Sequence, residues 1–289
     1  EGIKTMKSLL GTVQILTVER IIETGYVLTD GDHEILLHQN ETHGQLKEQQ
    51  QIDVFLYEDK KGQVVATMDI PTVLFDHYDW VPVVEVVPKL GVFVNIGISK
   101  EILVSSDDLP LFHKVWPAKD DRLYVKLDTD KRGRLIAKPA DESIINIIRE
   151  DAPGSILNQP ISGYVYHTSR EGTAIFSEEG YRGFIHHSER KEEPRLGQWV
   201  KGRVIAVKDD GTLNISLRPL KQDSISQDAE TILDHLTREG GVIPFSDKSS
   251  PEVIKDTFQI SKAAFKRALG KLMKEGKIEQ KDGKTYLKG

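Results

Sequence analysis

The chain of 289 residues is too long for one small barrel or bundle, and we expect it to contain two to four domains. Its composition, with 38% apolar and 29% charged residues, is ordinary for a globular protein, and no stretch reaches the roughly 18 apolar residues of a membrane helix. It contains no cysteine, which excludes disulfide frameworks, thiolate metal sites and a cysteine nucleophile.

The start of the chain and its charge distribution bear on compartment and partners. Glu1-Gly2-Ile3-Lys4 is not a basic segment followed by an apolar one, so we expect no signal peptide and a cytoplasmic protein. The net charge is −6, but residues 251–289 contain ten Lys and Arg against five Asp and Glu, a net charge of +5 that leaves −11 for the rest. A basic tail on an acidic body favours a polyanionic or acidic partner.

Two stretches show the same order of short β-branched and aromatic runs, separated by turn residues, which predicts strands. In residues 8–71 the strands are predicted near Gly11–Val13 and at Gly25–Leu28, Glu34–His38, Ile52–Tyr57 and Val64–Thr67. In residues 82–138 they are predicted at Val83–Val87, Leu90–Gly97, Glu101–Ser105, Leu123–Leu127 and Arg134–Ala137. A repeat of roughly 60 residues indicates tandem copies of one domain, with Pro71, Pro82 and Pro139 near the boundaries.

A short helix is predicted after Pro139. Asp141 is a suitable N-cap, and the helix should end before Pro153. Isoleucines separated by polar residues form a one-sided apolar stripe: Ile144, Ile145, Ile147 and Ile148. We expect this helix to be a packed spacer without chemistry of its own.

Residues 160–218 contain the clearest copy of the strand pattern. Five short antiparallel strands close economically into a Greek-key barrel without exposed edges. The motif positions are Gly163, Val165, Gly172, Ile175, Gly183, Phe184, Ile185, His186, Ser188, Gly197, Val200 and Val204. In these positions the stretch resembles the S1 RNA-binding domain, first named for the largest small-subunit ribosomal protein. The resemblance implies an oligonucleotide-binding (OB) fold.

The tail changes from strands to helices. Ile232, Leu233 and Leu236 lie on one face of a predicted helix that Gly240-Gly241 ends. Ser250 and Ser261 cap two further predicted helices, the second of which runs to about Lys274 with four inward residues, Phe265, Leu269, Leu272 and Met273. Residues 277–287 form a hairpin with an Asp-Gly turn. Three helices and a hairpin predict a winged helix-turn-helix.

The predicted fold is therefore multidomain: three all-β, five-stranded OB barrels of the S1 type, followed by an α+β winged helix-turn-helix. The expected boundaries are 1–71, 72–139, 140–221 (spacer helix and third barrel) and 222–289. This order of domains resembles the bacterial conserved virulence factor B family over essentially the whole chain. The resemblance implies an RNA-binding regulatory protein without a catalytic domain.

Strand alternation predicts the RNA-binding face of the third barrel. Inward Val165, Ile175 and Ile185 place five candidates outside, namely Tyr166, Phe176, Arg182, Phe184 and His186. The resemblance puts stacking aromatics at positions 171 and 174, which are Glu171 and Ala174 here, so Phe176 and Tyr166 are candidate replacements. Alternatively, a neighbouring domain covers Phe176 and Phe184. A metal site at His186-His187 is disfavoured, because adjacent strand residues point to opposite faces.

The other barrels hold fewer candidates. In the second barrel Phe93 occupies the stacking position, while Leu90 and Val104 stand where the family has an aromatic and the histidine. Nearby cations are candidates for phosphate contacts: Lys100, Arg122, Lys126 and Arg132. The alternative is a merely solvated basic surface. In the first barrel His38 matches the motif, and Tyr26 is expected to point into the core.

On the winged helix, a row of cations lies away from the predicted core: Lys262, Lys266, Arg267, Lys271 and Lys274 on the last helix, and Lys281 and Lys284 on the wing. We expect them to contact nucleic-acid phosphates, with a solvated helix face as the alternative.

Catalytic motifs such as a phosphate-binding Gly loop, HExxH or a nucleophile elbow do not occur, so we expect neither an enzyme nor a cofactor. The leading hypothesis is a non-enzymatic protein that binds single-stranded RNA through tandem barrels and a basic winged helix, in post-transcriptional gene regulation. One alternative is a transcriptional regulator whose winged helix binds duplex DNA. Another is a module that docks on ribosomes or other proteins.

Overall fold

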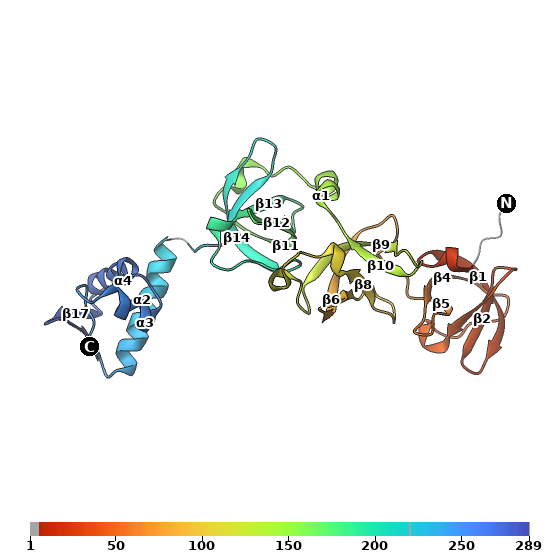
Figure 1. Ribbon diagram of the computed structural model, residues 1–289, viewed down its shortest axis with the longest axis horizontal. Coiled ribbons are helices and arrows are strands. Elements are labelled where there is room, and N and C mark those ends of the chain that lie inside the picture. The colour runs from red at the N-terminus through yellow and green to blue at the C-terminus, as the bar shows by residue number, and fades with distance from the viewer. Residues whose placement is uncertain (1–5, 220, 289) are drawn as a thin grey trace. The chain divides into compact units, whose positions relative to one another are not determined.

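The computed structural model describes residues 6–219 and 221–288, and the chain divides into two compact units, Glu1–Leu217 and Arg218–Gly289 (Figure 1). The first unit contains three closed five-stranded β-barrels. The second contains three helices and a three-stranded sheet. The predicted fold class, three OB barrels followed by a winged helix-turn-helix, is confirmed.

The elements of the first unit follow the predicted repeat. The first barrel consists of η1 (Met6–Leu9), β1 (Val13–Ile22), β2 (Gly25–Thr29), β3 (Glu34–His38), η2 (Gln39–Glu41), β4 (Gln51–Glu58) and β5 (Val64–Thr67). The second consists of β6 (Asp79–Val87), β7 (Gly91–Val94), β8 (Ile102–Ser105), η3 (Ser106–Asp108), η4 (His113–Val115), β9 (Arg122–Thr129) and β10 (Leu135–Pro139). After α1 (Glu142–Ile148) and η5 (Gly154–Ile156), the third consists of β11 (Pro160–Thr168), β12 (Gly172–Ser177), β13 (Arg182–His186), η6 (His187–Glu189), β14 (Trp199–Val207) and β15 (Leu213–Ser216).

All three barrels close in the same way. The strands of the first barrel are ordered β1-β2-β3-β5-β4 around the wall, and the other two repeat this cyclic order. Neighbouring strands are antiparallel except the third and fifth, which are parallel. The first strand of each barrel is irregular directly after Val18, Val83 and Val165. A bulge there bends the strand so that it can pair with neighbours on both sides.

A glycine opens the second strand of each barrel for a steric reason. A Cβ atom on Gly25, Gly91 or Gly172 would lie 2.2, 2.0 or 2.4 Å from a backbone carbonyl oxygen of the third strand. No side chain fits at that distance, so this glycine of the sequence motif is needed for the barrel wall to close.

Apolar side chains join the three barrels into one unit. The core of the second barrel continues into the first through Phe55 and Tyr57 of β4, and toward the third through Leu196. Between the second and third barrels, the guanidinium of Arg195 donates two hydrogen bonds, of 3.0 and 3.1 Å, to the buried carboxylate of Asp121.

The predicted spacer helix is α1, and the Asp141 side chain caps it by accepting from two backbone N–H groups of its first turn. The predicted four-residue apolar stripe is wrong. Ile145 is buried, but Ile147 is 78% and Ile148 38% exposed. The helix has only seven residues and packs through a single apolar side chain.

The second unit has the topology of a winged helix. Its elements are α2 (Lys221–Arg238), β16 (Val242–Ile243), α3 (Pro251–Phe258), α4 (Lys262–Lys274), β17 (Ile278–Lys281) and β18 (Lys284–Leu287). Ser250 and Ser261 cap α3 and α4 as predicted. Within residues 6–219 and 221–288, no helix is long and apolar enough to cross a membrane.

Two details of the winged helix differ from the sequence prediction. Met273 was expected inside but is 47% exposed, whereas the other three predicted core residues of α4 are buried. The sheet also contains a third strand, β16, which pairs with β18 and was not predicted because it has only two residues. At the tip of the wing, Asp282 and Gly283 both have positive φ angles, 51° and 76°, as a two-residue hairpin turn requires.

Phe265→Ala is expected to lower the free energy of unfolding of the second unit by about 3–5 kcal/mol, because Phe265 is fully buried and its loss leaves a cavity. Met273→Ala on the same helix is the control and should cost less than about 0.5 kcal/mol. All three tryptophans lie in the barrels, so urea unfolding followed by Trp fluorescence reports the first unit and far-UV circular dichroism reports the helices. An equal shift of both transitions would contradict the presence of a separate core.

Candidate nucleic-acid interface

Strand register identifies the equivalent positions of the three barrels. The glycine that opens the second strand faces His38 in the first barrel, Ser105 in the second and His186 in the third. The prediction that Val104 stands in place of the histidine is therefore wrong by one residue. Val104 is fully buried in the core.

The side chains at this position cap the 3-10 turn that follows the third strand. Nδ1 of His38 accepts a hydrogen bond from the backbone N–H of Asn40 at 3.2 Å, and Nδ1 of His186 accepts one from Ser188 at 3.3 Å. Ser105 does the same through its hydroxyl. The motif histidine thus has a local structural role, which leaves one side of the exposed His186 ring for other contacts.

His186 and His187 do not point to opposite faces as predicted. Their ring centroids are 4.1 Å apart, because His187 already belongs to the 3-10 turn rather than to the strand. Among the residues that the structure describes, no group of three or more His, Asp or Glu side chains could hold a metal ion.

The stacking position is occupied by an aromatic ring in one barrel only. Register aligns Val27, Phe93 and Ala174 on the second strands. Val27 is 8% and Ala174 2% exposed, while the Phe93 ring is half-buried and reaches a groove. Phe93 is therefore the one aromatic ring at this position, and it is accessible from the groove.

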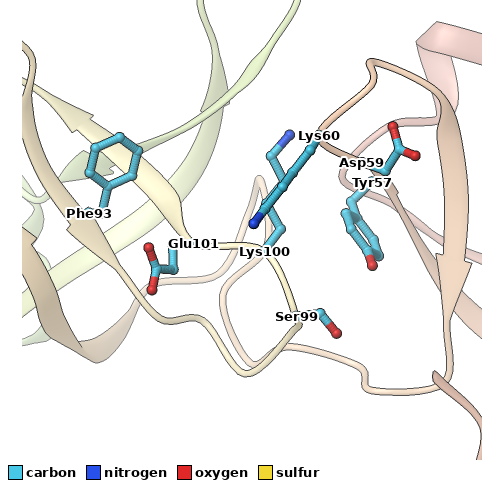
Figure 2. A pocket seen from close by; sticks show the side chains of 7 residues that line it. All are labelled: Tyr57, Asp59, Lys60, Phe93, Ser99, Lys100 and Glu101. Carbon is cyan, nitrogen blue, oxygen red and sulfur yellow. The ribbon is translucent and has the colours of Figure 1, made fainter. Parts of the chain in front are cut away.

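The groove at Phe93 has a volume of about 480 Å³ and lies where the first and second barrels meet. The second barrel contributes Phe93 with Ser99, Lys100 and Glu101, and the first barrel contributes three residues around its β4–β5 turn, Tyr57, Asp59 and Lys60. Figure 2 shows the two lysine side chains between Phe93 on one side and Tyr57 with Asp59 on the other. The sequence predicted Phe93 and Lys100, but the half from the first barrel depends on how the barrels dock.

Hydrogen bonds join the first and second barrels below this groove. Nζ of Lys100 donates to the backbone oxygen of Glu58 at 2.6 Å, and burial lowers the pKa of this lysine. The hydroxyls of Tyr57 and Ser99 both donate to one carboxylate oxygen of the buried Glu41. Burial and the nearby Glu41 charge raise the pKa of Tyr57 to about 12. Lys100 and Ser99 thus join the second barrel to the first, and Lys60 is the exposed cation of the groove.

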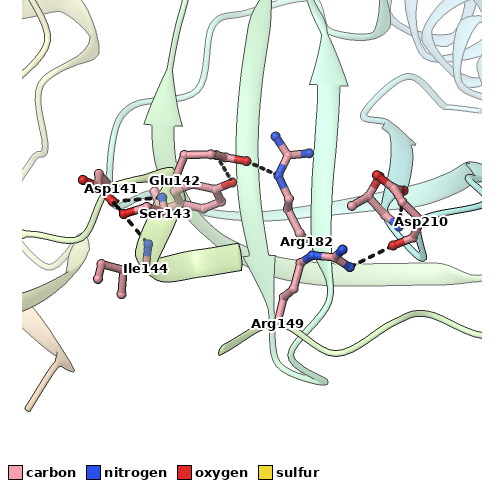
Figure 3. Close-up of polar contacts among 9 residues, drawn as sticks. Asp141, Glu142, Ser143, Ile144, Arg149, Arg182 and Asp210 are labelled. Atoms are coloured by element: carbon pink, nitrogen blue, oxygen red, sulfur yellow. Dashed lines mark hydrogen bonds and ion pairs between the residues drawn. The ribbon is translucent and has the colours of Figure 1, made fainter. Parts of the chain in front are cut away.

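Part of the predicted binding face of the third barrel lies under α1. Tyr166 is 6% exposed, and its hydroxyl donates to Oε2 of Glu142 at 2.6 Å. Nε of Arg182 donates to Oε1 of the same carboxylate at 2.5 Å, and Figure 3 shows Glu142 turned toward this arginine. Ile145 packs against Tyr166 and Ala174. Tyr166 and Arg182 point outward from the barrel as predicted, but Tyr166 is buried and the Arg182 side chain is only 19% exposed.

Phe176, Phe184 and His186 differ in their surroundings. Phe176 is partly buried against the cluster that Ile145 of α1 forms with Tyr166 and Ala174. Trp80 and Tyr124 of the second barrel pack against the same cluster, so both α1 and a neighbouring domain lie on this face. Phe184 and His186 instead line a groove of about 340 Å³, together with Lys208 and Asn214 of the β14–β15 hairpin. This second groove keeps two of the five predicted residues of the third barrel accessible.

Five aromatic rings, none of them a predicted site residue, form a row across the second and third barrels. Successive ring centroids are 4.6–5.5 Å apart along Tyr78, Tyr124, Trp80, Tyr164 and Trp199. Nζ of the predicted Lys126 lies 5.7 Å from the centroid of Tyr78, so this lysine is engaged with the row. Arg122 and Arg132 are exposed elsewhere on the second barrel.

The predicted cations of the winged helix are not equally available. Nζ of Lys271 donates to the Ser226 hydroxyl at 2.5 Å and lies 3.7 Å from Glu275. Lys266 is 4.0 Å from Asp247. Lys262 is half-buried, and the remaining four are exposed: Arg267, Lys274, Lys281 and Lys284. The exposed cations of α4 and of the wing are the stronger candidates for phosphate contacts.

Comparison with known proteins assigns all four domains. Residues 78–138 match the CvfB first S1-like domain, residues 145–219 the second domain of the virulence regulatory factor CvfB, and residues 230–287 the CvfB-like winged helix domain. Residues 10–69 match the S1 domain. Conserved virulence factor B of Staphylococcus aureus (strain N315) is 35% identical over 285 residues, covering 97% of this chain and 95% of that protein. The chain belongs to the conserved virulence factor B family.

Two further relatives match this chain over almost its whole length. The uncharacterized protein YitL of Bacillus subtilis (strain 168) is 48% identical over 273 residues, which cover 94% of this chain and 92% of that protein. The crystal structure of a multidomain protein with nucleic acid binding domains from Streptococcus pneumoniae has 37% identity and a TM-score of 0.67, over 97% of this chain and 99% of that one. This conserved virulence factor B family member is thus built from nucleic-acid-binding S1-like and winged-helix domains rather than from typical enzyme domains.

The contact below α1 should depend on pH. Burial opposes ionisation of Glu142, but the hydrogen bonds from Tyr166 and Arg182 outweigh it, so the carboxyl pKa lies below its ordinary value of 4.5. At pH values above 4.5, ionised Glu142 therefore contributes its full stabilisation of the fold. This stabilisation is lost as pH falls through the pKa of Glu142 in the folded state, which is lower than 4.5. Glu142→Gln should destabilise the first unit at about pH 7, and by progressively less as pH falls below 4.5, in urea unfolding followed by Trp fluorescence. A destabilisation that persists unchanged at lower pH would contradict this role.

Proposed function

We propose that this chain binds single-stranded RNA, that the groove at Phe93 is its main base-stacking site, and that it acts in post-transcriptional gene regulation without catalysing a reaction. The observation that carries the proposal is the composition of this groove. It combines a half-buried aromatic ring with two lysines, on a domain type that binds nucleic acid. Single strands bind such barrels by stacking bases on rings while cations follow the phosphates.

The groove supplies each kind of contact that an unpaired nucleotide needs. One face of Phe93 can stack on a base, an interaction worth about 1–3 kcal/mol. Lys60 and Lys100 lie where they can reach the adjoining phosphates, and Lys100 keeps two N–H donors after its bond to the backbone. The carboxylates of Asp59 and Glu101 can accept hydrogen bonds from base amino groups.

Further weak sites along the same chain would add to the affinity. The second groove offers Phe184, His186 and Lys208 on the third barrel, and the winged helix offers exposed cations on α4 and the wing. Once one site holds an RNA strand, the effective concentration of that strand at the next site rises. A long single strand should therefore bind more tightly than a short one.

Duplex nucleic acid is a second candidate ligand, favoured by one observation on α4. This 13-residue helix, the second helix of the helix-turn-helix, carries five cations and no acidic residue. In helix-turn-helix proteins that helix enters the major groove. Under this alternative the protein is a DNA-binding regulator, and it should prefer duplex DNA to single-stranded RNA of equal length.

Phe93→Ala should weaken binding of labelled single-stranded RNA by about 5- to 150-fold, the loss of one stacked base. Phe112→Ala is the matched control, since Phe112 is 72% exposed on a loop of the same barrel and lies outside the groove. Its effect should stay within about twofold. Fluorescence anisotropy with single-stranded RNA, single-stranded DNA and duplex DNA measures all three ligands. Equal losses in the two variants, or tighter binding of duplex DNA, would argue against the proposed site.

Replacing Arg267, Lys274 and Lys284 together by Ala should flatten the salt dependence of RNA binding. Each phosphate contact that is lost lowers the slope of log K against log salt by about 0.7 for a single strand, so a total change of about 2 is expected. Lys271→Ala should change the slope little, because its ammonium group already contacts Ser226 and Glu275. An unchanged slope in the triple variant would remove the winged helix from the RNA-binding surface.

A further inference from the structure

The helix α1 covers a face in the third barrel that is open in the second. Ala174 and Phe93 occupy equivalent positions, yet Ala174 is 2% exposed below α1 and Phe93 reaches a groove. Tyr166 packs in the same cluster as Ala174, and its hydroxyl and the Arg182 guanidinium both contact Glu142 of α1. The third barrel thus has ligand-binding chemistry on this face, but the chain's own helix occupies it.

The group that α1 inserts is an anion. The two oxygens of the Glu142 carboxylate divide the available donors between them, since Oε2 accepts from Tyr166 at 2.6 Å and Oε1 accepts from Arg182 at 2.5 Å. A guanidinium and a hydroxyl that hold two oxygens of one anion also suit the oxygens of a phosphate diester. A carboxylate and a phosphate cannot occupy this place together.

The contacts that hold α1 over the face are few. A seven-residue helix is too short to be stable by itself and depends on its packing. Ile145 is its single buried residue, and Ile147 and Ile148 remain exposed. On either side the backbone is fixed to a barrel, with Ala140 N–H bonded to the Tyr124 oxygen and Glu150 N–H to the Gly180 oxygen. Between these two anchors, α1 is held by Ile145, by Glu142 and by Arg149, which donates to the Asp210 oxygen of the third barrel, and none of these contacts belongs to the strand pairing of a barrel.

We propose that Arg182 and Tyr166 form a phosphate-binding site for single-stranded RNA, which Glu142 occupies in the free chain and which RNA enters by displacing α1. This inference rests on the proposed RNA-binding function and adds a second RNA-binding site. At this site the Glu142 carboxylate of the chain itself competes with an RNA phosphate. Because only the open fraction of the chain binds at this site, weakening the competitor raises the apparent affinity.

The test uses the full-length chain and a labelled single-stranded RNA of about 16 nucleotides, the upper length that one OB barrel covers. Glu142→Gln should tighten binding at least about fivefold, because it removes the competing charge. Glu179→Gln removes the same charge from an exposed turn of the same barrel, and its effect should remain below about twofold. Thermal unfolding of each variant checks that the barrels are folded.

Arg182→Ala then distinguishes a site from a merely structural contact. It should weaken binding in the otherwise unchanged chain, and weaken it more in the Glu142→Gln chain, where it abolishes the gain. Hydrogen exchange provides a readout without mutation, since RNA should speed exchange at the amides of Ile145 and Arg149, which are hydrogen-bonded in α1.

Three outcomes would overturn the inference. Glu142→Gln could have no more effect than Glu179→Gln, Arg182→Ala could weaken binding equally in both backgrounds, or RNA could leave exchange in α1 unchanged. If any of these occurs while Phe93→Ala still weakens binding, the inference fails and the proposed function stands. If neither the unchanged chain nor Glu142→Gln binds RNA, both are wrong.

Discussion

Continuous apolar packing between neighbouring barrels decides which parts of their outer walls reach solvent. The core of the second barrel extends through Phe55 and Tyr57 into the first and through Leu196 toward the third. One consequence is the Phe93 groove, whose two sides come from different barrels. Another is the aromatic row of Tyr78, Tyr124, Trp80, Tyr164 and Trp199, in which rings of the second and third barrels pack on each other. These ring faces contact each other and stabilise the packing of the two barrels.

Much of the fold could be predicted from local backbone geometry. The glycine that begins each second strand, the serine caps of α3 and α4 and the Asp-Gly turn of the wing are all dictated by backbone geometry within a few residues. Such features can be predicted from sequence because few alternatives satisfy them. Alternation also placed Tyr166 and Arg182 correctly on the outside of the barrel wall.

What could not be predicted depends on contacts between distant segments. A side chain on the outside of the barrel wall is not always exposed, because α1 packs over Tyr166 and Ala174. Lys60 joins Phe93 only through docking of two barrels. The error of one residue at Val104 had a different origin. Ser105, another capping side chain, stands where the motif has its histidine, and only the strand register shows that Ser105 and this histidine are equivalent. A hydroxyl and an imidazole nitrogen can each accept the capping hydrogen bond, so residue type alone gave no signal.

In the proposed function, unpaired RNA contacts this chain at Phe93. Photocrosslinking of a 4-thiouridine-containing single-stranded RNA to the full-length chain, followed by mass spectrometry of the peptides, tests it most directly. We expect crosslinked nucleotides on residues 90–101 and on the β4–β5 turn around Lys60, two segments that contribute to one groove. Crosslinks confined to residues 221–288, with none on these two segments, would contradict it.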